Sequence, residues 1–264
     1  MNIEKINTIY FSPTHTSAKI CCDVAKSLVV KDENIIDYEI THEAPKEIVS
    51  FSENDIAVVA VPTYGGRVAP IAIERLRKFK GSKTLAVAIV LYGNRDYEDA
   101  LLELCDELSE LGFIPIAGGA FIGEHSYSRK NMPTAEGRPD VKDMEIASEF
   151  GKKIASKINM ATSFEQFQRV SVKGKVPYRQ NSAPTPDAPF VDDSLCVQCM
   201  LCVDNCPVQA ISLVDNVIFC SPDKCIKCCR CVKDCPQEAL TFNTPYTEKL
   251  HVNFSKYRVP ELFL

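Results

Sequence analysis

The chain has 264 residues, which is enough for more than one domain. Its formal net charge of −5 at pH 7 argues against a nucleic-acid partner, because nucleic-acid-binding surfaces are basic. The best apolar segment, residues 84–91, has the length of a buried strand and is too short to span a bilayer, so we expect no membrane partner.

The first 160 residues alternate short apolar runs with helical patterns. Strands are expected at residues 6–11, 35–40, 55–61, 84–91 and 113–122. Helices are expected at residues 16–30, 71–80, 97–111 and 141–158. This alternation predicts an α/β domain over residues 1–160, in which a five-stranded parallel sheet has helices on both faces. Such sheets bind ligands at the carboxyl ends of their strands, near the point where the strand order reverses.

Three loops that follow expected strands carry candidate binding residues. In the first loop, hydroxyl and backbone N–H groups gather at a helix N-terminus, an arrangement that suits a phosphate. Its candidates are Ser12, Thr14, His15, Thr16 and Ser17. The loop has neither a Walker lysine nor the pattern G-x-G-x-x-G, so nucleoside triphosphates and dinucleotides fit poorly. An ordinary helix N-cap is the alternative interpretation.

The other two loops each place an aromatic residue beside glycine after a buried strand. The candidates are Pro62, Thr63, Tyr64, Gly65 and Gly66 in one loop, and Tyr92, Gly93, Asn94 and Tyr97 in the other. Two such loops side by side can hold a flat heterocycle between aromatic rings while backbone groups contact its edge. Strand-to-helix turns with incidental tyrosines are the alternative.

Residues 161–189 have the composition of a linker, and residues 182–189 are punctuated by proline. Four basic residues precede the prolines: Arg169, Lys173, Lys175 and Arg179. They form either a solvated charge run or a surface that packs on the domain that follows. We expect that small domain at residues 190–243, and then a tail at residues 244–264 whose apolar end docks or frays.

The small domain contains the same cysteine phrase twice. Cys196-x2-Cys199-x2-Cys202-x3-Cys206-Pro207 recurs as Cys225-x2-Cys228-x2-Cys231-x3-Cys235-Pro236. This is the run that binds 4Fe–4S clusters, in which the fourth cysteine ligates the other cluster. Three closely spaced thiolates can hold one side of a cluster but cannot also reach its far corner, so the fourth ligand must come from elsewhere in the chain. An internal repeat this short predicts two halves related by a pseudo-two-fold axis.

The motif assigns two ligand sets. The first cluster takes Cys196, Cys199, Cys202 and Cys235, and the second takes Cys225, Cys228, Cys231 and Cys206. Zinc is an alternative, although it prefers two separated cysteine pairs. Disulfides are another, although they need an oxidising compartment.

The remaining cysteines and the start of the chain bear on the compartment. The sequence has thirteen cysteines and opens with polar residues in place of an apolar signal segment, so we expect a reduced, cytoplasmic location. Cys21, Cys22 and Cys105 lie in expected helices and are interpreted as small core residues. Cys220 and Cys229 lie outside the repeat register, so we expect neither to be a ligand.

Several phrases together resemble a known family. They are Phe11-Ser12-Pro13-Thr14, Tyr64-Gly65-Gly66-Arg67-Val68, Tyr92-Gly93-Asn94-Arg95, Ala120-Phe121-Ile122-Gly123-Glu124-His125-Ser126 and Gly137-Arg138-Pro139-Asp140. With the cysteine motifs, they resemble the flavodoxin–ferredoxin fusion proteins of anaerobic bacteria and archaea over nearly the whole chain. The resemblance implies a flavodoxin-like five-stranded parallel sheet followed by a small α+β two-cluster ferredoxin domain. It implies FMN and electron transfer as well.

Carried over to this sequence, the resemblance assigns roles to the loops. Ser12, Thr14, Thr16 and Ser17 would hold the FMN phosphate, and His15 replaces the usual glycine of that loop. Tyr64 and Tyr97 would be the stacking rings, with Tyr92 as a substitute, and Gly65 or Gly66 would present backbone to the flavin N5. Arg95 and His125 either approach the flavin or lie in solvent.

The leading functional hypothesis is an electron carrier that passes electrons between 4Fe–4S clusters and FMN, with redox proteins as partners. One alternative is a flavin-dependent reductase, favoured by an open pocket over the ring lined by His125, Tyr127 and Arg129. A redox-sensing interaction protein is a third hypothesis. No catalytic residue is assigned. In a homodimer, the ferredoxin domain of one subunit would cover the flavin of the other.

Overall fold

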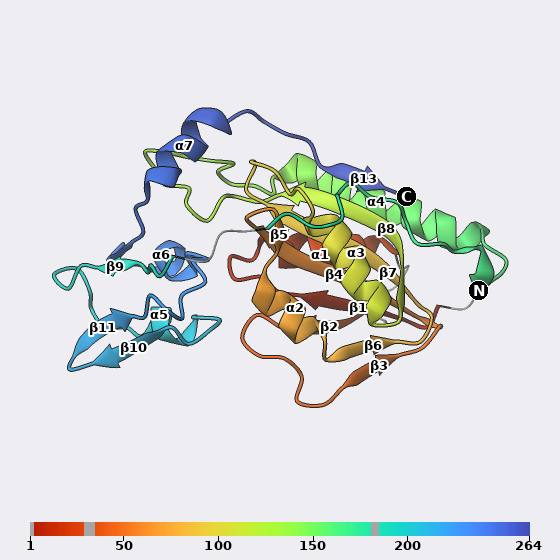
Figure 1. Cartoon of the computed structure of the whole chain (residues 1–264), viewed down its shortest axis with the longest axis horizontal. Coiled ribbons are helices and arrows are strands. Elements are labelled where there is room, and N and C mark those ends of the chain that lie inside the picture. The colour runs from red at the N-terminus through yellow and green to blue at the C-terminus, as the bar shows by residue number, and fades with distance from the viewer. Residues whose placement is uncertain (1–2, 29–34, 181–184) are drawn as a thin grey trace.

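The computed structural model describes residues 3–28, 35–180 and 185–264. A large domain contains the main sheet and its helices, and a smaller lobe lies to its left in Figure 1. No helix within these described ranges is long and apolar enough to cross a membrane.

The main sheet has five parallel strands and one antiparallel edge strand. The parallel strands are β1 (Lys5–Tyr10), β2 (Ile35–Glu39), β4 (Asp55–Tyr64), β7 (Thr84–Tyr92) and β8 (Phe113–Ile122). They lie in the order β2-β1-β4-β7-β8, and β13 (Glu261–Phe263) pairs with β8 in the antiparallel sense. Counting only the parallel strands, this is the order 2-1-3-4-5 of a flavodoxin-like sheet. The strand order reverses between β1 and β4, where a ligand site is expected.

Two apolar layers hold the helices on the sheet. The helices are α1 (Thr16–Leu28), α2 (Pro70–Leu76), α3 (Ala100–Glu110) and α4 (Val141–Met160). Successive side chains of a strand point to opposite faces, so Val58 joins the layer under α1 and α4 while Val59 joins the layer under α2 and α3. Cys21 and Cys105 are buried in these layers, as expected for small core residues, and Cys22 is half-buried.

The helix boundaries differ in places from the sequence prediction. The helix expected at residues 71–80 ends at Leu76, because the chain turns there into a short strand. That strand, β6 (Phe79–Gly81), pairs with β3 (Val49–Phe51), and β5 (Arg67–Val68) pairs with the end of β4. The last two residues of the helix expected at 16–30 lie outside the described residues.

The small lobe consists of two similar halves. Its elements are β9 (Phe190–Val191), α5 (Leu201–Asp204), β10 (Ile211–Val214), β11 (Val217–Cys220), α6 (Arg230–Asp234) and β12 (Leu240–Thr241). The strands form two antiparallel pairs, β9 with β12 and β10 with β11. Each helix follows a residue in the left-handed conformation, Met200 before α5 and Cys229 before α6. The sequence repeat is therefore also a repeat of backbone conformation.

The basic stretch before the prolines packs on the large domain. After the short helix η2 (Phe164–Gln166), the backbone N–H of Val170 donates to the carbonyl of Pro115 over 2.8 Å. The cations form ion pairs with the large domain and the tail: Arg169 with Asp106, Lys173 with Glu261, and Arg179 with Glu98. Three of the four cations thus pair with acids of the large domain and the tail, although all four side chains remain exposed. Part of the proline segment, residues 181–184, lies outside the described residues.

The tail returns to the large domain and docks there. It contains α7 (Pro245–Asn253) and the edge strand β13. The Asn94 amide donates to the carbonyls of Phe254 and Lys256, at 2.5 and 2.8 Å. The Arg258 guanidinium donates to the carbonyl of Arg95 over 2.6 Å. The chain therefore enters the small lobe from the large domain and returns to it, as Figure 1 shows.

Candidate redox site

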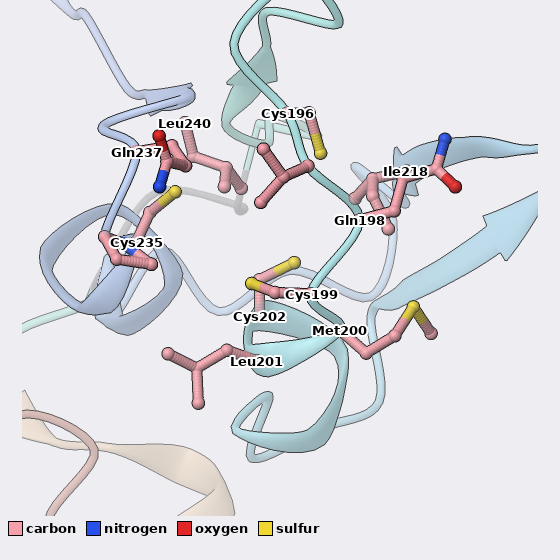
Figure 2. Close-up of a pocket in the computed structure, with 12 residues that line it drawn as sticks. Cys196, Gln198, Cys199, Met200, Leu201, Cys202, Ile218, Cys235, Gln237 and Leu240 are labelled. Atoms are coloured by element: carbon pink, nitrogen blue, oxygen red, sulfur yellow. The ribbon is translucent and has the colours of Figure 1, made fainter.

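One cavity in the small lobe brings together the first set of predicted cysteines. Figure 2 shows Cys196, Cys199, Cys202 and Cys235 around it, with Ile218 and Leu240 among the apolar side chains of the wall. The fourth cysteine comes from the second repeat, as the motif requires. Cys199 is exposed, so this cavity lies close to the lobe surface.

A second cavity collects the other predicted set. Cys225, Cys228 and Cys231 line it together with Cys206 from the first repeat. Cys220 and Cys229, which the register excludes as ligands, also lie in its wall, and the Cys229 thiol donates to the carbonyl of Lys227 over 3.7 Å. No group of three His, Cys, Asp or Glu side chains converges on a single-ion position in the residues that the structure describes.

Backbone geometry around the two cavities is nearly the same. Positive φ angles recur at equivalent positions: Gln198 and Lys227 at 53° and 58°, Met200 and Cys229 at 65° and 57°, and Gln209 and Glu238 at 52° and 51°. In each half a backbone N–H donates to the sulfur of the crossing cysteine. These are Ala210 to Cys206 at 3.2 Å and Ala239 to Cys235 at 3.3 Å. An N–H donor favours a thiolate, which is the form that binds iron.

The thiols of the second cavity also suit a bound metal group. Burial, with smaller contributions from the neighbouring thiols, raises the pKa of the Cys228 thiol to about 12. Burial likewise raises the pKa of Cys231 well above its usual range. Thiols in such a place stay protonated unless a metal group supplies positive charge. The donor set, the crossed arrangement and the N–H···S contacts therefore fit a cluster in each cavity.

The first loop of the large domain lies at the predicted ligand edge of the sheet. Ser12 is buried, and its hydroxyl accepts from the N–H of Ala18 over 3.0 Å, so it caps α1. Ser17 is 1 % exposed, and its hydroxyl has no hydrogen-bond partner among the described residues. Thr14 and Thr16 are partly exposed. A buried hydroxyl without a partner at a helix N-terminus fits a phosphate oxygen.

His15 occupies the position where the resembling family has glycine. Its φ is 62°, in the left-handed region, and its side chain is exposed. Histidine enters this region more readily than bulky or β-branched residues. The loop therefore keeps the backbone shape that a glycine would allow.

The second loop lies against the small lobe. Its Thr63 hydroxyl is buried and has no hydrogen-bond partner in the described part of the chain. Burial raises the pKa of Tyr64, and the nearby thiols of Cys228 and Cys229 raise it further, which places this ring beside the second cavity. Pro62 lies at the end of β4, and Gly65 and Gly66 follow with φ of 63° and 86°, a turn that glycine makes without strain.

The third loop is covered by the C-terminal tail. The rings of Tyr92 and Tyr97 are each 3 % exposed, lie 5.5 Å apart and belong to the core, and the Tyr97 hydroxyl donates to Glu261 over 2.9 Å. Neither ring is open beside the phosphate loop, because the tail covers both. The Asn94 side chain is likewise bonded to the tail. Gly93 lies against the His125 ring, which a Cβ at this position would approach within 2.3 Å.

The residues of the suggested open pocket are partly covered by neighbouring segments. The Tyr127 ring packs on Phe242 and Tyr246, with centroids 5.3 and 6.5 Å away. The Arg129 guanidinium donates to the carbonyl of Phe242 over 2.6 Å. Burial lowers the pKa of His125 to about 4, so its ring is neutral at pH 7. Arg95 forms an ion pair with Glu98 over 2.7 Å, so its side chain does not extend freely into solvent.

Contacts between the two domains were not predicted from the sequence. Arg230 of α6 donates to the carbonyl of Pro13 over 2.9 Å, and Arg75 of α2 donates to the carbonyl of Pro207 over 2.8 Å. Lys233 pairs with Glu124 over 2.5 Å. Sequence pattern carries no signal for these contacts, since an arginine that bonds a distant carbonyl has no local signature.

Among the comparisons with known proteins, the most direct match falls in the small lobe. Residues 189–212 match the family model of the 4Fe-4S binding domain. No curated protein matches the chain.

Among solved structures, a flavodoxin from Streptococcus pneumonia TIGR4 is 18% identical, with 58% of this chain and 98% of that chain covered at a TM-score of 0.41. A flavodoxin from the domain Archaea is 12% identical, with coverages of 59% and 99% and a TM-score of 0.40. A flavone reductase is 10% identical, with coverages of 82% and 74% and a TM-score of 0.43.

The family match and the strand order together describe the two parts of the chain. The small lobe contains a 4Fe-4S binding domain. The chain is, further, a fusion of that ferredoxin-type domain to a flavodoxin-like sheet, as the strand order shows.

Proposed function

We propose that the protein transfers electrons between two 4Fe–4S clusters and FMN within one chain. The observation that carries the proposal is the position of the second cavity. The loop from Cys225 to Cys229 lies beside Tyr64, and Arg230, which follows it at the start of α6, bonds to the carbonyl of Pro13 in the phosphate loop. The most buried cysteine site thus faces the ligand edge of the sheet.

Each set of residues has a defined part in this function. Cys196, Cys199, Cys202 and Cys235 hold the outer cluster, and Cys206, Cys225, Cys228 and Cys231 hold the inner one. Ser12, Thr14, Thr16 and Ser17 receive the FMN phosphate, and Tyr64 with Gly65 and Gly66 borders the ring. When bound, the clusters carry single electrons and FMN carries one or two. Apolar walls and the docked lobe keep water away from the inner site.

The outer cavity is the contact point proposed for redox partner proteins. Its cysteine Cys199 is exposed, and Val197 and Leu201 beside it are 62 % and 38 % exposed. Exposed apolar side chains around a redox group suit a transient protein contact. A partner would then exchange electrons with the outer cluster, while the inner cluster serves FMN.

Anaerobic stopped-flow reduction tests the proposal. We expect about eight iron and eight acid-labile sulfide per chain, and FMN released on denaturation. After rapid reduction of the clusters, the flavin and cluster absorption bands should reach equilibrium at a rate independent of protein concentration. A rate that rises linearly with concentration would show two separate carriers on one chain. A homodimer that exchanges lobes would give the same independence, and sedimentation at the same concentrations distinguishes it.

A further inference from the structure

Arg230 is a buried cation that reaches from the small lobe into the large domain. It is 8 % exposed, lies at the start of α6 and immediately follows the loop of the inner cavity. Its Nε donates to Asp234 over 3.0 Å, and its Nη1 donates to the carbonyl of Pro13 over 2.9 Å. A guanidinium has five N–H donors, and these two contacts use two of them.

The partner of this cation is the phosphate loop. Pro13 lies between Ser12 and Thr14, in the turn that leads into α1. The first turn of α1, which follows, contains the buried Ser17 hydroxyl that has no partner among the described residues. Burying a charge is costly unless it is paired, and Asp234 on the lobe surface accounts for one contact. Arg230 still has N–H donors beyond these two contacts, and the Ser17 hydroxyl at the N-terminus of α1 has no partner among the described residues, so both groups can bond an anion placed between them.

We propose that Arg230 binds the phosphate of FMN, so that the ferredoxin-type lobe supplies the positive charge of the flavin site. This inference rests on the proposed function, because it requires FMN in the large domain. A guanidinium can bond two oxygens of a phosphate monoester at once, which a lysine cannot do. The phosphate would then be held from one side by the loop of the sheet and from the other by α6.

Such a contact couples flavin binding to docking of the lobe. If the docked lobe strengthens FMN binding, bound FMN must strengthen docking by the same factor. A chain with FMN bound would hold its inner cluster against the flavin loop more firmly than a chain without FMN. The protein would thereby assemble its electron path only when the flavin is present.

Paired titrations with FMN and riboflavin test the proposal, because riboflavin has the same ring and lacks the phosphate. The protein is freed of flavin with its clusters intact, and each flavin is titrated anaerobically by its fluorescence. Arg230→Gln should weaken FMN binding about tenfold or more and change riboflavin binding less than twofold. Lys233→Gln is the matched control, since Lys233 pairs with Glu124 across the same interface. It should affect both flavins alike.

The outcomes separate this inference from the proposed function. Equal weakening of FMN and riboflavin by Arg230→Gln would show that Arg230 only packs the lobe, and unchanged FMN affinity would also overturn the proposal. If the unaltered protein binds no FMN, the proposed function itself fails. Competition by inorganic phosphate should weaken FMN and spare riboflavin in the unaltered protein.

Hydrogen exchange gives a test that does not depend on the variant folding. Addition of FMN to the flavin-free protein should slow amide exchange in residues 225–234, while riboflavin should slow it much less. Equal protection by the two flavins would contradict a phosphate contact from this segment.

Arg230→Lys, which keeps the positive charge and loses the two-pronged geometry of the guanidinium, should show an intermediate loss of FMN affinity.

Discussion

The two cysteine cavities share a backbone and differ in their surroundings. Both are built by the same motif, with the same left-handed residues and the same N–H···S contacts. The outer cavity contains the exposed Cys199, whereas in the inner cavity Cys228 and Cys231 are buried. The repeat therefore defines the cysteine set of each cavity, and only the inner cavity lies beside the flavodoxin-like domain.

The largest effect is expected from removing one crossing ligand at a time. Cys206→Ser should lose the inner cluster, and with it about half of the iron and nearly all flavin–cluster equilibration. Cys235→Ser should lose the outer cluster and keep that equilibration. EPR of the reduced proteins, with iron analysis, identifies which cluster remains. The opposite pattern would mean that each motif binds its own four cysteines.

Acid pH tests whether the covered region around the inner cavity is as dry as its burial indicates. Burial lowers the pKa of His125 to about 4 in the folded state, against about 6.5 when unfolded. The unfolded chain thus binds a proton more readily, so folding stability should fall as the pH drops from about 6.5 towards 4 and level off below that.

The loss of stability is on the order of a few kcal/mol, because a tenfold change in a proton affinity corresponds to about 1.4 kcal/mol. Urea unfolding between pH 7 and 5 should show a shallower decline for His125→Gln than for the unaltered protein. His42→Gln removes an exposed histidine and should leave the decline unchanged. An NMR titration in which the His125 ring protonates near pH 6.5 would contradict a covered site.

Ser17→Ala sharpens the contrast between a protein contact and a ligand contact. Because the Ser17 hydroxyl has no partner among the described residues, its removal should not destabilise the flavin-free protein. FMN binding should weaken about tenfold, since a hydrogen bond to a charged group is worth roughly 1.5–3 kcal/mol. Thr14→Ala should weaken FMN in the same direction. If both variants bound FMN as tightly as the unaltered protein does, the phosphate would have to lie elsewhere.

The smallest effect is expected at Tyr97, where the loop contacts the tail. Tyr97→Phe keeps the ring and removes only the hydrogen bond to Glu261. The free energy of unfolding should fall by about 1 kcal/mol, and FMN affinity should not change. Tyr64→Leu is the comparison, since it should weaken FMN binding by removing a ring beside the inner cavity. Tyr97→Leu removes the ring itself, and a large loss of FMN affinity in that variant would restore Tyr97 as a stacking residue.

Local patterns predicted much of this molecule. The alternation of apolar runs and helices predicted the five parallel strands, most clearly β4, β7 and β8, which are buried on both faces and form nearly continuous apolar runs. The cysteine spacing predicted which thiols gather in each cavity, since the ligand geometry of the motif leaves few alternatives. Both signals are contained in short stretches of chain.

Features that depend on distant contacts were predicted less well. The basic residues after Gln166 have the pattern of a solvated run, yet three of them pair with acids on α3, its preceding loop and the tail. The contact between Tyr97 and the tail was not predicted, because Glu261 lies far along the chain from Tyr97. The sequence around Arg230 did not indicate its contact with the large domain, since the carbonyl that it bonds, that of Pro13, lies near the start of the chain.

The course of the chain limits how the small lobe can move. A body on one tether can swing in any direction, but the chain joins this lobe to the large domain at both ends, through the segment before β9 and through α7 and β13. Two connections define an axis, so we expect the lobe to move mainly by rotation about the line that joins them. Such a rotation would return the inner cavity to the same position against the large domain each time.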